Sequence, residues 1–262
     1  MNLGLAGKRA LVTAASDGLG FASARALAAE GAAVALCSRD RARAAAAAER
    51  IADETGATAL AFQADVASDT DLRTLFEQAT AALGGLEVLV CNAGGPPPGG
   101  FEKLEESQWD LAYHLTLQSV VRSIRYALPH LRAAGGGRVL AITSSSVKRP
   151  LANLLLSNVF RPAVQGLIKT LSSELAADGI QLNCLAPGRI ETGRVNQLDR
   201  ALAERQGSSF EEVRERSLAA IPMGRLGTPE EFGRVAAFLC SEAASYMTGA
   251  TVLVDGGAVR CL

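Results

Sequence analysis

Histidine, paired cysteines and long apolar runs are all scarce in this chain of 262 residues. With two histidines, and five cysteines that form no Cys-x-x-Cys pair, the chain is not expected to bind a metal. The formal net charge is -1 and no basic stripe is present, which argues against a nucleic acid partner. No apolar run approaches the roughly 20 residues that a membrane-spanning helix needs, so no membrane partner is expected.

The first residues, 1–8, also lack the charged and apolar segments that make up a secretory signal. We therefore expect a cytoplasmic protein. Hydrophobic residues make up 48% of the chain, which is enough to form a sizeable core.

Short apolar runs alternate with longer amphipathic segments along the chain. The runs predict strands at 9–13, 33–37, 58–63, 88–91, 138–143, 180–185 and 251–254. The amphipathic segments predict helices at 18–30, 40–54, 69–83, 107–131, 153–177, 198–218 and 229–241. This alternation is typical of right-handed βαβ units. We expect one α/β domain over residues 1–262, a doubly wound (Rossmann) parallel sheet of about seven strands with helices on both faces.

A glycine-rich turn joins the first predicted strand to the first predicted helix. It reads Thr13-Ala14-Ala15-Ser16-Asp17-Gly18-Leu19-Gly20. Such a turn lets the backbone approach a diphosphate, and the free amides of the helix N-terminus then bind it. A plain tight turn between strand and helix is the alternative interpretation of this segment alone.

The turn resembles the T-G-x-x-x-G-x-G loop of the short-chain dehydrogenase/reductase family. Thr13, Gly18 and Gly20 match, and Ala14 stands at the first glycine. We expect the extra methyl group to be tolerated, provided that φ at Ala14 stays negative.

Further segments resemble family motifs in the same order along the chain. They are Asp65-Val66, Cys91-Asn92-Ala93-Gly94, residues 183–192, residues 224–231 and residues 254–257. The resemblance implies a nicotinamide dinucleotide cofactor. The implied cofactor contacts are Thr13, Ser16, Asp17, Gly18, Leu19, Gly20, Arg39, Asp65, Val66, Asn92, Ala93, Gly94, Pro187, Gly188, Ile190 and Thr192.

The residue after the second strand indicates which dinucleotide is bound. An acidic side chain there favours NAD, whereas a basic one pairs with the 2′-phosphate of NADP. The chain has Ser38-Arg39, so NADP(H) is expected over NAD(H). Asp17 lies near the same ribose in the family and carries the opposite sign, and a solvated surface role for Arg39 remains the alternative.

The catalytic positions depart from the family pattern of Asn, Ser, Tyr and Lys. Alignment places Ser144 at the serine, Ser157 at the tyrosine, Arg161 at the lysine and Thr116 at the asparagine. A serine hydroxyl is a far weaker acid than a phenol, and arginine stays protonated. We therefore expect an altered proton route.

Two other side chains are candidate substitutes for the missing acid. Lys148 follows the fifth strand on the ligand side of the sheet, and Tyr113 lies three residues before Thr116. A solvated loop lysine and a packing tyrosine are the alternatives. Pro162 follows Arg161 directly, and we expect the helix to bend or restart there.

The resemblance is nearest to the bacterial 3-oxoacyl-(acyl-carrier-protein) reductase-like branch, including members with an imperfect tetrad. It implies interconversion of a ketone, such as a 3-oxoacyl group, and a secondary alcohol. A catalytically silent dinucleotide-binding protein with a regulatory or assembly role is the alternative. The resemblance also implies a homotetramer or homodimer packed through the long helices, for which the apolar residues 154–156 are suited. Residues 193–220 are charged, and we expect them to form a mobile lid.

Overall fold

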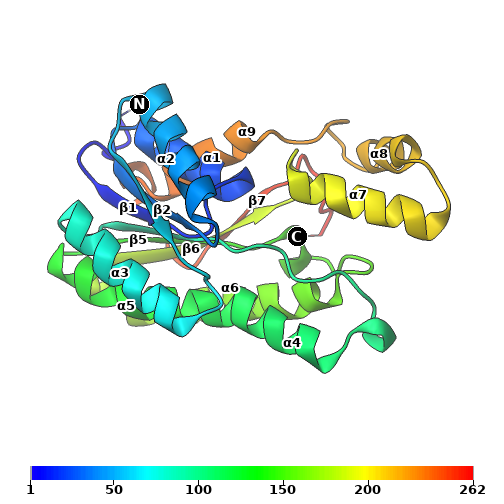
Figure 1. Ribbon diagram of the computed structural model, residues 1–262, viewed down its shortest axis with the longest axis horizontal. Coiled ribbons are helices and arrows are strands. Elements are labelled where there is room, and N and C mark those ends of the chain that lie inside the picture. Colours follow the sequence, from blue (N-terminus) through cyan, green and yellow to red (C-terminus); the bar gives the residue numbers. More distant parts are fainter. Residues whose placement is uncertain (1, 262) are drawn as a thin grey trace.

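The computed structural model describes residues 2–261 (Figure 1). Its centre is a seven-stranded parallel sheet in the order β3-β2-β1-β4-β5-β6-β7. The strands are β1 Arg9–Val12, β2 Ala33–Ser38, β3 Ala59–Gln63, β4 Val88–Cys91, β5 Gly137–Ile142, β6 Ile180–Pro187 and β7 Thr251–Val254. The predicted doubly wound fold with seven strands is confirmed, and the strand order reverses between β1 and β4, where such sheets bind ligands.

Helices cover both faces of the sheet because its strands are apolar on both faces. Ala10 and Val12 pack with α1 (Gly18–Ala29), α2 (Arg41–Thr55) and α9 (Pro229–Leu239), whereas Leu11 packs on the opposite side. That side carries α3 (Asp69–Leu83), α5 (Ser119–Ala133) and α6 (Leu155–Glu174), seen below the sheet in Figure 1. Alternation along a strand sends successive side chains to opposite faces, so a continuous apolar run fits a doubly covered sheet.

The long helix predicted at 107–131 is interrupted. The structure has α4 at Glu106–Ala112, a π-helical segment at Tyr113–Gln118, and α5 after it. The wider turn pairs side chains five residues apart, and Gln118 donates a hydrogen bond to the Tyr113 hydroxyl. Hydrophobic periodicity does not reveal a one-residue insertion of this kind, which is frequent at functional sites.

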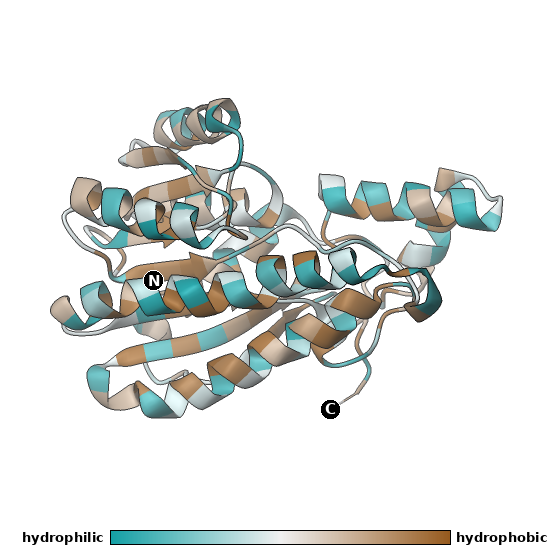
Figure 2. Ribbon diagram, turned by 60° about the horizontal axis from the view of Figure 1, so that its bottom comes forward, coloured by the Kyte–Doolittle hydropathy of each residue, from teal (hydrophilic) through white to brown (hydrophobic). Residues whose placement is uncertain are grey.

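The single helix predicted at 198–218 is wrong, because two helices occupy this region. They are α7 at Gly193–Gln206 and α8 at Phe210–Ala219. Gly207 ends α7 with φ 61°, a left-handed conformation that suits glycine, and Ser209 begins α8 by a capping box with Glu212. In Figure 2 this pair extends beyond the sheet and carries many hydrophilic residues.

The predicted break at Pro162 is not observed. Helix α6 is continuous from Leu155 to Glu174 with Pro162 inside it. The helix begins two residues later than predicted, because Asn153 adopts φ 60° and Leu154 is the N-terminal cap.

Short helical turns complete the chain at Phe101–Lys103, Ser145–Val147, Ala176–Asp178 and Glu242–Ala244. Within residues 2–261, no helix combines the length and apolar character needed to cross a membrane. The same part of the chain holds no group of three or more His, Cys, Asp or Glu side chains placed to bind a metal ion.

Candidate cofactor and substrate site

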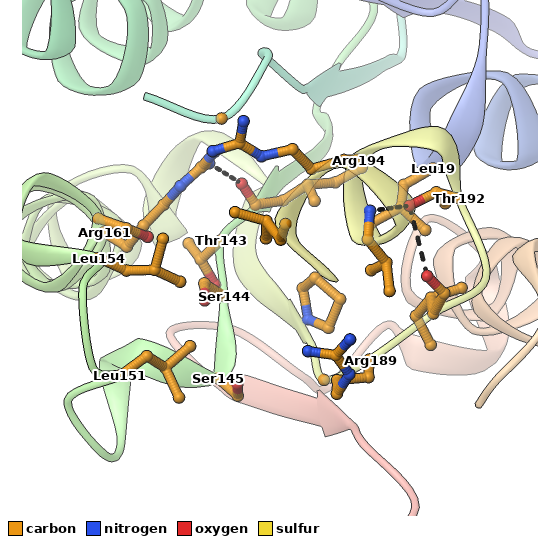
Figure 3. A pocket seen from close by; sticks show the side chains of 18 of the residues that line it. Leu19, Thr143, Ser144, Ser145, Leu151, Leu154, Arg161, Arg189, Thr192 and Arg194 are labelled. Atoms are coloured by element: carbon orange, nitrogen blue, oxygen red, sulfur yellow. Dashed lines mark hydrogen bonds between the residues drawn. The ribbon is translucent and has the colours of Figure 1, made fainter. Parts of the chain in front are cut away.

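A cavity of about 830 Å³ opens at the carboxyl ends of the central strands (Figure 3). Its walls come from the turn after β1, the loop after β4, the loop after β5, helix α6 and the segment from β6 through α7. Several predicted cofactor residues line it, namely Asp17, Gly18, Leu19, Asn92, Ala93, Gly94, Pro187, Gly188, Ile190 and Thr192. Three of the predicted catalytic residues, Ser144, Ser157 and Arg161, line the same cavity.

The turn after β1 is built to approach a ligand closely. Asp17 caps α1 by accepting a hydrogen bond from the Gly18 amide at 2.7 Å. The next amides, of Leu19 and Gly20, have no acceptor among the described residues. A Cβ on Gly20 would lie 2.6 Å from Asn92 Nδ2, so only glycine fits there. This arrangement fits a diphosphate at the helix N-terminus.

The backbone conformation of Ala14 differs from the one predicted from the sequence. Its φ is 47°, so the expectation of a negative φ is wrong. The backbone at Ala14 is in the left-handed region that favours glycine, and it is held there by the hydrogen bond from Asn92 Nδ2 to the Ala14 carbonyl at 2.9 Å. An alanine in this conformation is strained by about 1 kcal/mol.

Thr13 and Asn92 join the ends of β1 and β4. The Thr13 hydroxyl donates to the Asn92 carbonyl at 2.7 Å and accepts from the Asn92 amide at 2.8 Å. Thr13 is 2% exposed, so it supports the turn from beneath rather than facing the cavity.

The residues expected at the adenosine end lie outside this cavity. Ser16 Oγ donates to Ser38 Oγ at 3.1 Å, Arg39 is exposed, and Asp65 accepts from the Ala67 amide. Val66 is buried in the core beneath them. Arg43, which sequence reasoning missed, pairs with Asp17 at 3.5 Å and offsets the charge that opposes a 2′-phosphate.

The segment after β6 forms the opposite wall. A Cβ on Gly188 would lie 2.6 Å from the Cβ of Asp255, so this glycine allows the chain to pass the end of β7. Thr192 caps α7, and its hydroxyl accepts from the Val195 amide. The caps of α1 and α7 thus lie at one cavity.

Ser144 is placed to polarise a ligand oxygen. Its hydroxyl accepts a hydrogen bond from the Ser146 amide at 3.1 Å, which leaves its own proton free to donate. Ser157 lies 3.4 Å from Ser146 through their hydroxyl oxygens, and it is 9% exposed.

Arg161, which the sequence predicts at the position of the family lysine, is a buried cation. Its Nη1 donates to the Ile142 carbonyl at 2.7 Å, and the residue is 7% exposed. Burial, and then the nearby charge of Arg194, lower the pKa of the Arg161 guanidinium to about 10. Below that pH it stays charged, so near neutrality it cannot exchange a proton as a lysine-activated tyrosine would.

The remaining candidates lie away from the cavity wall. Thr116 is fully buried in the π-helical segment, and its hydroxyl has no hydrogen-bond partner among the described residues. Tyr113 packs against Phe160, and Lys148 is exposed. None of these three residues lines the cavity.

Sequence reasoning missed a set of arginines at the site. Besides Arg161, the lining includes Arg149, Arg189, Arg194 and Arg260. Arg149 follows the carboxyl end of β5, and Arg189 and Arg194 follow that of β6. Their positions after predicted strands could have identified them as candidates. Arg189 is paired with the buried Asp199, which also binds Arg214 at 2.9 Å.

The expectation that residues 154–156 form an interface is not supported. Leu154 lines the cavity and Leu156 is fully buried. Two of the five exposed large hydrophobic side chains, Leu111 (47%) and Val159 (42%), lie on α4 and α6; the other three are Phe101, Met223 and Tyr246.

Known proteins resemble the chain over nearly its whole length. Residues 13–259 match the family described as Enoyl-(Acyl carrier protein) reductase. The Dehydrogenase/reductase SDR family member 4 of Oryctolagus cuniculus is 37% identical over 260 residues, which cover 97% of this chain and 94% of that protein.

Solved structures agree with this result. The L-sorbose reductase of Gluconobacter frateurii, complexed with NADPH and L-sorbose, superposes with a TM-score of 0.95 at 31% identity, with 100% of both chains covered. A 7 alpha-hydroxysteroid dehydrogenase complexed with NADH and 7-oxo glycochenodeoxycholic acid gives a TM-score of 0.89 at 30% identity, covering 100% of this chain and 98% of the other. Both neighbours carry a nicotinamide dinucleotide, and the free amides and close glycines described above fit the same group. The chain belongs to the short-chain dehydrogenase/reductase family of oxidoreductases.

Proposed function

We propose that the protein is an NADP(H)-dependent oxidoreductase that interconverts a ketone and a secondary alcohol through an altered proton-transfer site. The observation that carries this proposal is that Leu19, at the free amides of α1, and Ser144 line one continuous cavity. A dinucleotide held at the first position can therefore face a carbonyl group at the second. The similar L-sorbose reductase, whose substrate is a ketose, supports this reaction class.

We assign each predicted catalytic residue a separate role in the reaction. The cofactor, when bound, supplies or accepts the hydride. Ser144 donates its free proton in a hydrogen bond to the carbonyl oxygen, and Ser157 closes the wall behind it. Arg161 supplies a fixed positive charge and donors for the ribose or the substrate. Thr116 takes a supporting position in the π-helical segment.

The proton must come from water in this scheme. Among the described residues that line the cavity, the ionisable side chains are five arginines and Asp17, with no Lys, Tyr, His or Cys. Loss of a general acid typically slows a reaction by about a hundred- to ten-thousand-fold. We therefore expect slow turnover relative to enzymes that have the Tyr-x-x-x-Lys pair.

The same observation favours a second function, that of a catalytically silent protein that binds the dinucleotide. The deciding experiment measures NADPH binding by fluorescence and NADPH consumption with a panel of ketones, including acetoacetyl thioesters for the 3-oxoacyl class. Turnover that falls in Ser144→Ala and Arg161→Ala supports the oxidoreductase. Tight NADPH binding without turnover supports the silent protein, and no binding contradicts both.

A double change tests the altered site directly. Ser157→Tyr with Arg161→Lys restores the family pair, and we expect turnover to rise by about tenfold or more, since a positioned acid is regained. The single change Ser157→Tyr is the control, because it adds the phenol but leaves Arg161 in place. Unchanged turnover in a folded double variant would show that proton transfer is not limiting.

The preference for NADP(H) is also a proposal, and it depends on Arg39. Arg39→Asp should weaken NADPH binding by roughly tenfold to a hundredfold and strengthen NADH binding, because a charge-assisted contact to the 2′-phosphate is replaced by repulsion. Arg41→Asp, on the neighbouring first turn of α2, is the control for general charge. Equal effects on both cofactors would contradict the assignment.

We further propose that the protein forms a homodimer or homotetramer through the long helices. The exposed side chain of Val159 on the long helix α6, with Leu111 exposed on α4 beside it, supports this assembly. Light scattering of the wild type and of Val159→Asp tests it, since only the variant should dissociate.

A further inference from the structure

Arg161 and Arg194 place two positive charges together in the cavity. Their guanidinium groups point toward one another in Figure 3. Both residues line the cavity, and the charge of Arg194 acts on Arg161. Like charges in a partly dehydrated site repel, so the arrangement is costly unless an anion completes it.

The described residues supply no carboxylate to this pair. Within residues 2–261, neither guanidinium forms an ion pair with a carboxylate, whereas the nearby Arg189 is paired with Asp199. Each of the two groups makes a single described hydrogen bond, from Arg161 to the Ile142 carbonyl and from Arg194 to the Pro96 carbonyl. A guanidinium carries five N–H donors, so most of them remain available.

The surroundings hold Arg194 at this point. A Cβ on Gly95 would lie 2.7 Å from Arg194 Nε and 2.9 Å from its Cζ, so the guanidinium lies against this glycine. The bond to Pro96 at 2.7 Å fixes its far end. Arg161 is fixed from the other side by helix α6 and strand β5. The two arginines therefore form a built site rather than a pair of mobile surface charges.

We propose that Arg161 and Arg194 together bind an oxyanion, and that this oxyanion is a carboxylate carried by the substrate. The inference rests on the proposed function and names its substrate class, a keto acid or hydroxy acid. The position favours the substrate over the diphosphate of the dinucleotide, which shares the same chemistry. In Figure 3 Arg194 starts from α7 beside Thr192, and its guanidinium extends to Arg161 and Thr143, away from Leu19 at the free amides of α1.

The charge of the cavity as a whole agrees with an anionic substrate. Five arginines line it; Arg189 is paired with Asp199, and the one lining aspartate, Asp17, belongs to the dinucleotide end, so an excess of positive charge remains. Guanidinium groups bind carboxylates through paired hydrogen bonds, which adds orientation to affinity. A carboxylate held there would place the carbonyl group of the same molecule beside Ser144.

The test compares ketones that differ only in charge. Acetoacetate with acetoacetamide, and pyruvate with pyruvamide, are assayed with NADPH on the wild type, Arg194→Gln, Arg194→Lys and Arg205→Gln. Arg205 is exposed on the same helix and controls for the loss of one positive charge. NADPH affinity of each variant is measured separately by fluorescence.

We expect the wild type to favour the acid over its amide by roughly tenfold to a hundredfold in kcat/KM, since charge-assisted hydrogen bonds are the strong ones. Arg194→Gln should lose this preference with NADPH affinity unchanged, Arg194→Lys should retain part of it, and Arg205→Gln should retain all of it.

The absence of a preference in a wild type that turns over ketones would overturn the carboxylate site. A loss of NADPH affinity alone in Arg194→Gln would assign the arginines to the cofactor diphosphate and would equally overturn it. Failure of NADPH to bind at all would instead contradict the proposed function, on which the carboxylate site rests.

Discussion

Ala14 shows how a single methyl group can be retained at a position that favours glycine. Its φ of 47° is fixed by the hydrogen bond between its carbonyl and Asn92 and by the close packing of Gly20. Ala14→Gly should relieve the left-handed strain and stabilise the protein by about 0.5 to 1 kcal/mol, even after the entropy of the extra glycine. Urea unfolding measures this difference.

The neighbouring residue provides the control for that substitution. Ala15 is fully buried with no positive φ, so Ala15→Gly should destabilise the protein by a similar amount. Destabilisation by both changes would show that Ala14 is not strained.

We expect the buried charge of Arg161 to lower the free energy of unfolding of the protein. Burial lowers the pKa of its guanidinium to about 10, which means that the fold disfavours its charged form. Arg161→Met should therefore raise the free energy of unfolding by about 1 kcal/mol while it abolishes turnover, because an apolar side chain often replaces a buried ion without loss. Arg161→Lys keeps the charge and should bring no gain. A clear loss of stability in the Met variant would mean that the bond to Ile142 outweighs the desolvation.

At the level of single residues, the sequence predicted site positions correctly where the backbone geometry allows only one residue type. Gly20 and Gly188 are positions where a Cβ would collide with its neighbours, and both were predicted. Arg194 was not predicted, because its guanidinium is placed by a contact with Gly95, which is distant in the sequence and leaves no local pattern.

At the scale of elements, helices α7 and α8 form the outer wall of the cavity. They were predicted as one helix because the hydrophilic pattern continues across Gly207 and Ser209. Their pairing depends on Asp199, which is 1% exposed and binds Arg189 and Arg214. Arg189 precedes the pair, so this network ties the segment after β6 to both helices.

Asp199→Asn should release that outer wall. The change leaves two arginines without their shared carboxylate, and breaking a buried ion pair costs roughly 3 kcal/mol. We expect faster proteolysis within α7 and α8 and a higher KM for ketones. Glu215→Gln, exposed on α8, is the matched control. Equal protease resistance in Asp199→Asn and wild type would rule out this role.

The π-helical segment could not be predicted for a similar reason. Tyr113–Gln118 keeps the apolar spacing of an ordinary helix, and the extra residue shows only in the contact between Gln118 and Tyr113. By contrast, the seven strands and their order followed from apolar runs whose lengths and order suit a buried parallel sheet.

At the scale of the whole molecule, the proposed reaction uses a dinucleotide site and a serine that polarises the carbonyl group, and the described lining residues include no side chain that releases a proton near neutral pH. Asp17 and five arginines are the ionisable groups among the described residues that line the cavity. The pKa of Arg161, lowered to about 10, leaves this group charged throughout the neutral range. Its cation is present below that pH and is lost above it, so turnover should fall only in strongly alkaline solution.

The dependence of kcat on pH tests this account most directly, measured with NADPH and a ketone from about pH 5.5 to 10.5. The wild type should show no break that belongs to an enzyme group below about pH 9. The variant with Ser157→Tyr and Arg161→Lys should gain one, since its tyrosine would titrate. A clear break near neutrality in the wild type would reveal a proton donor within the protein and would contradict the account.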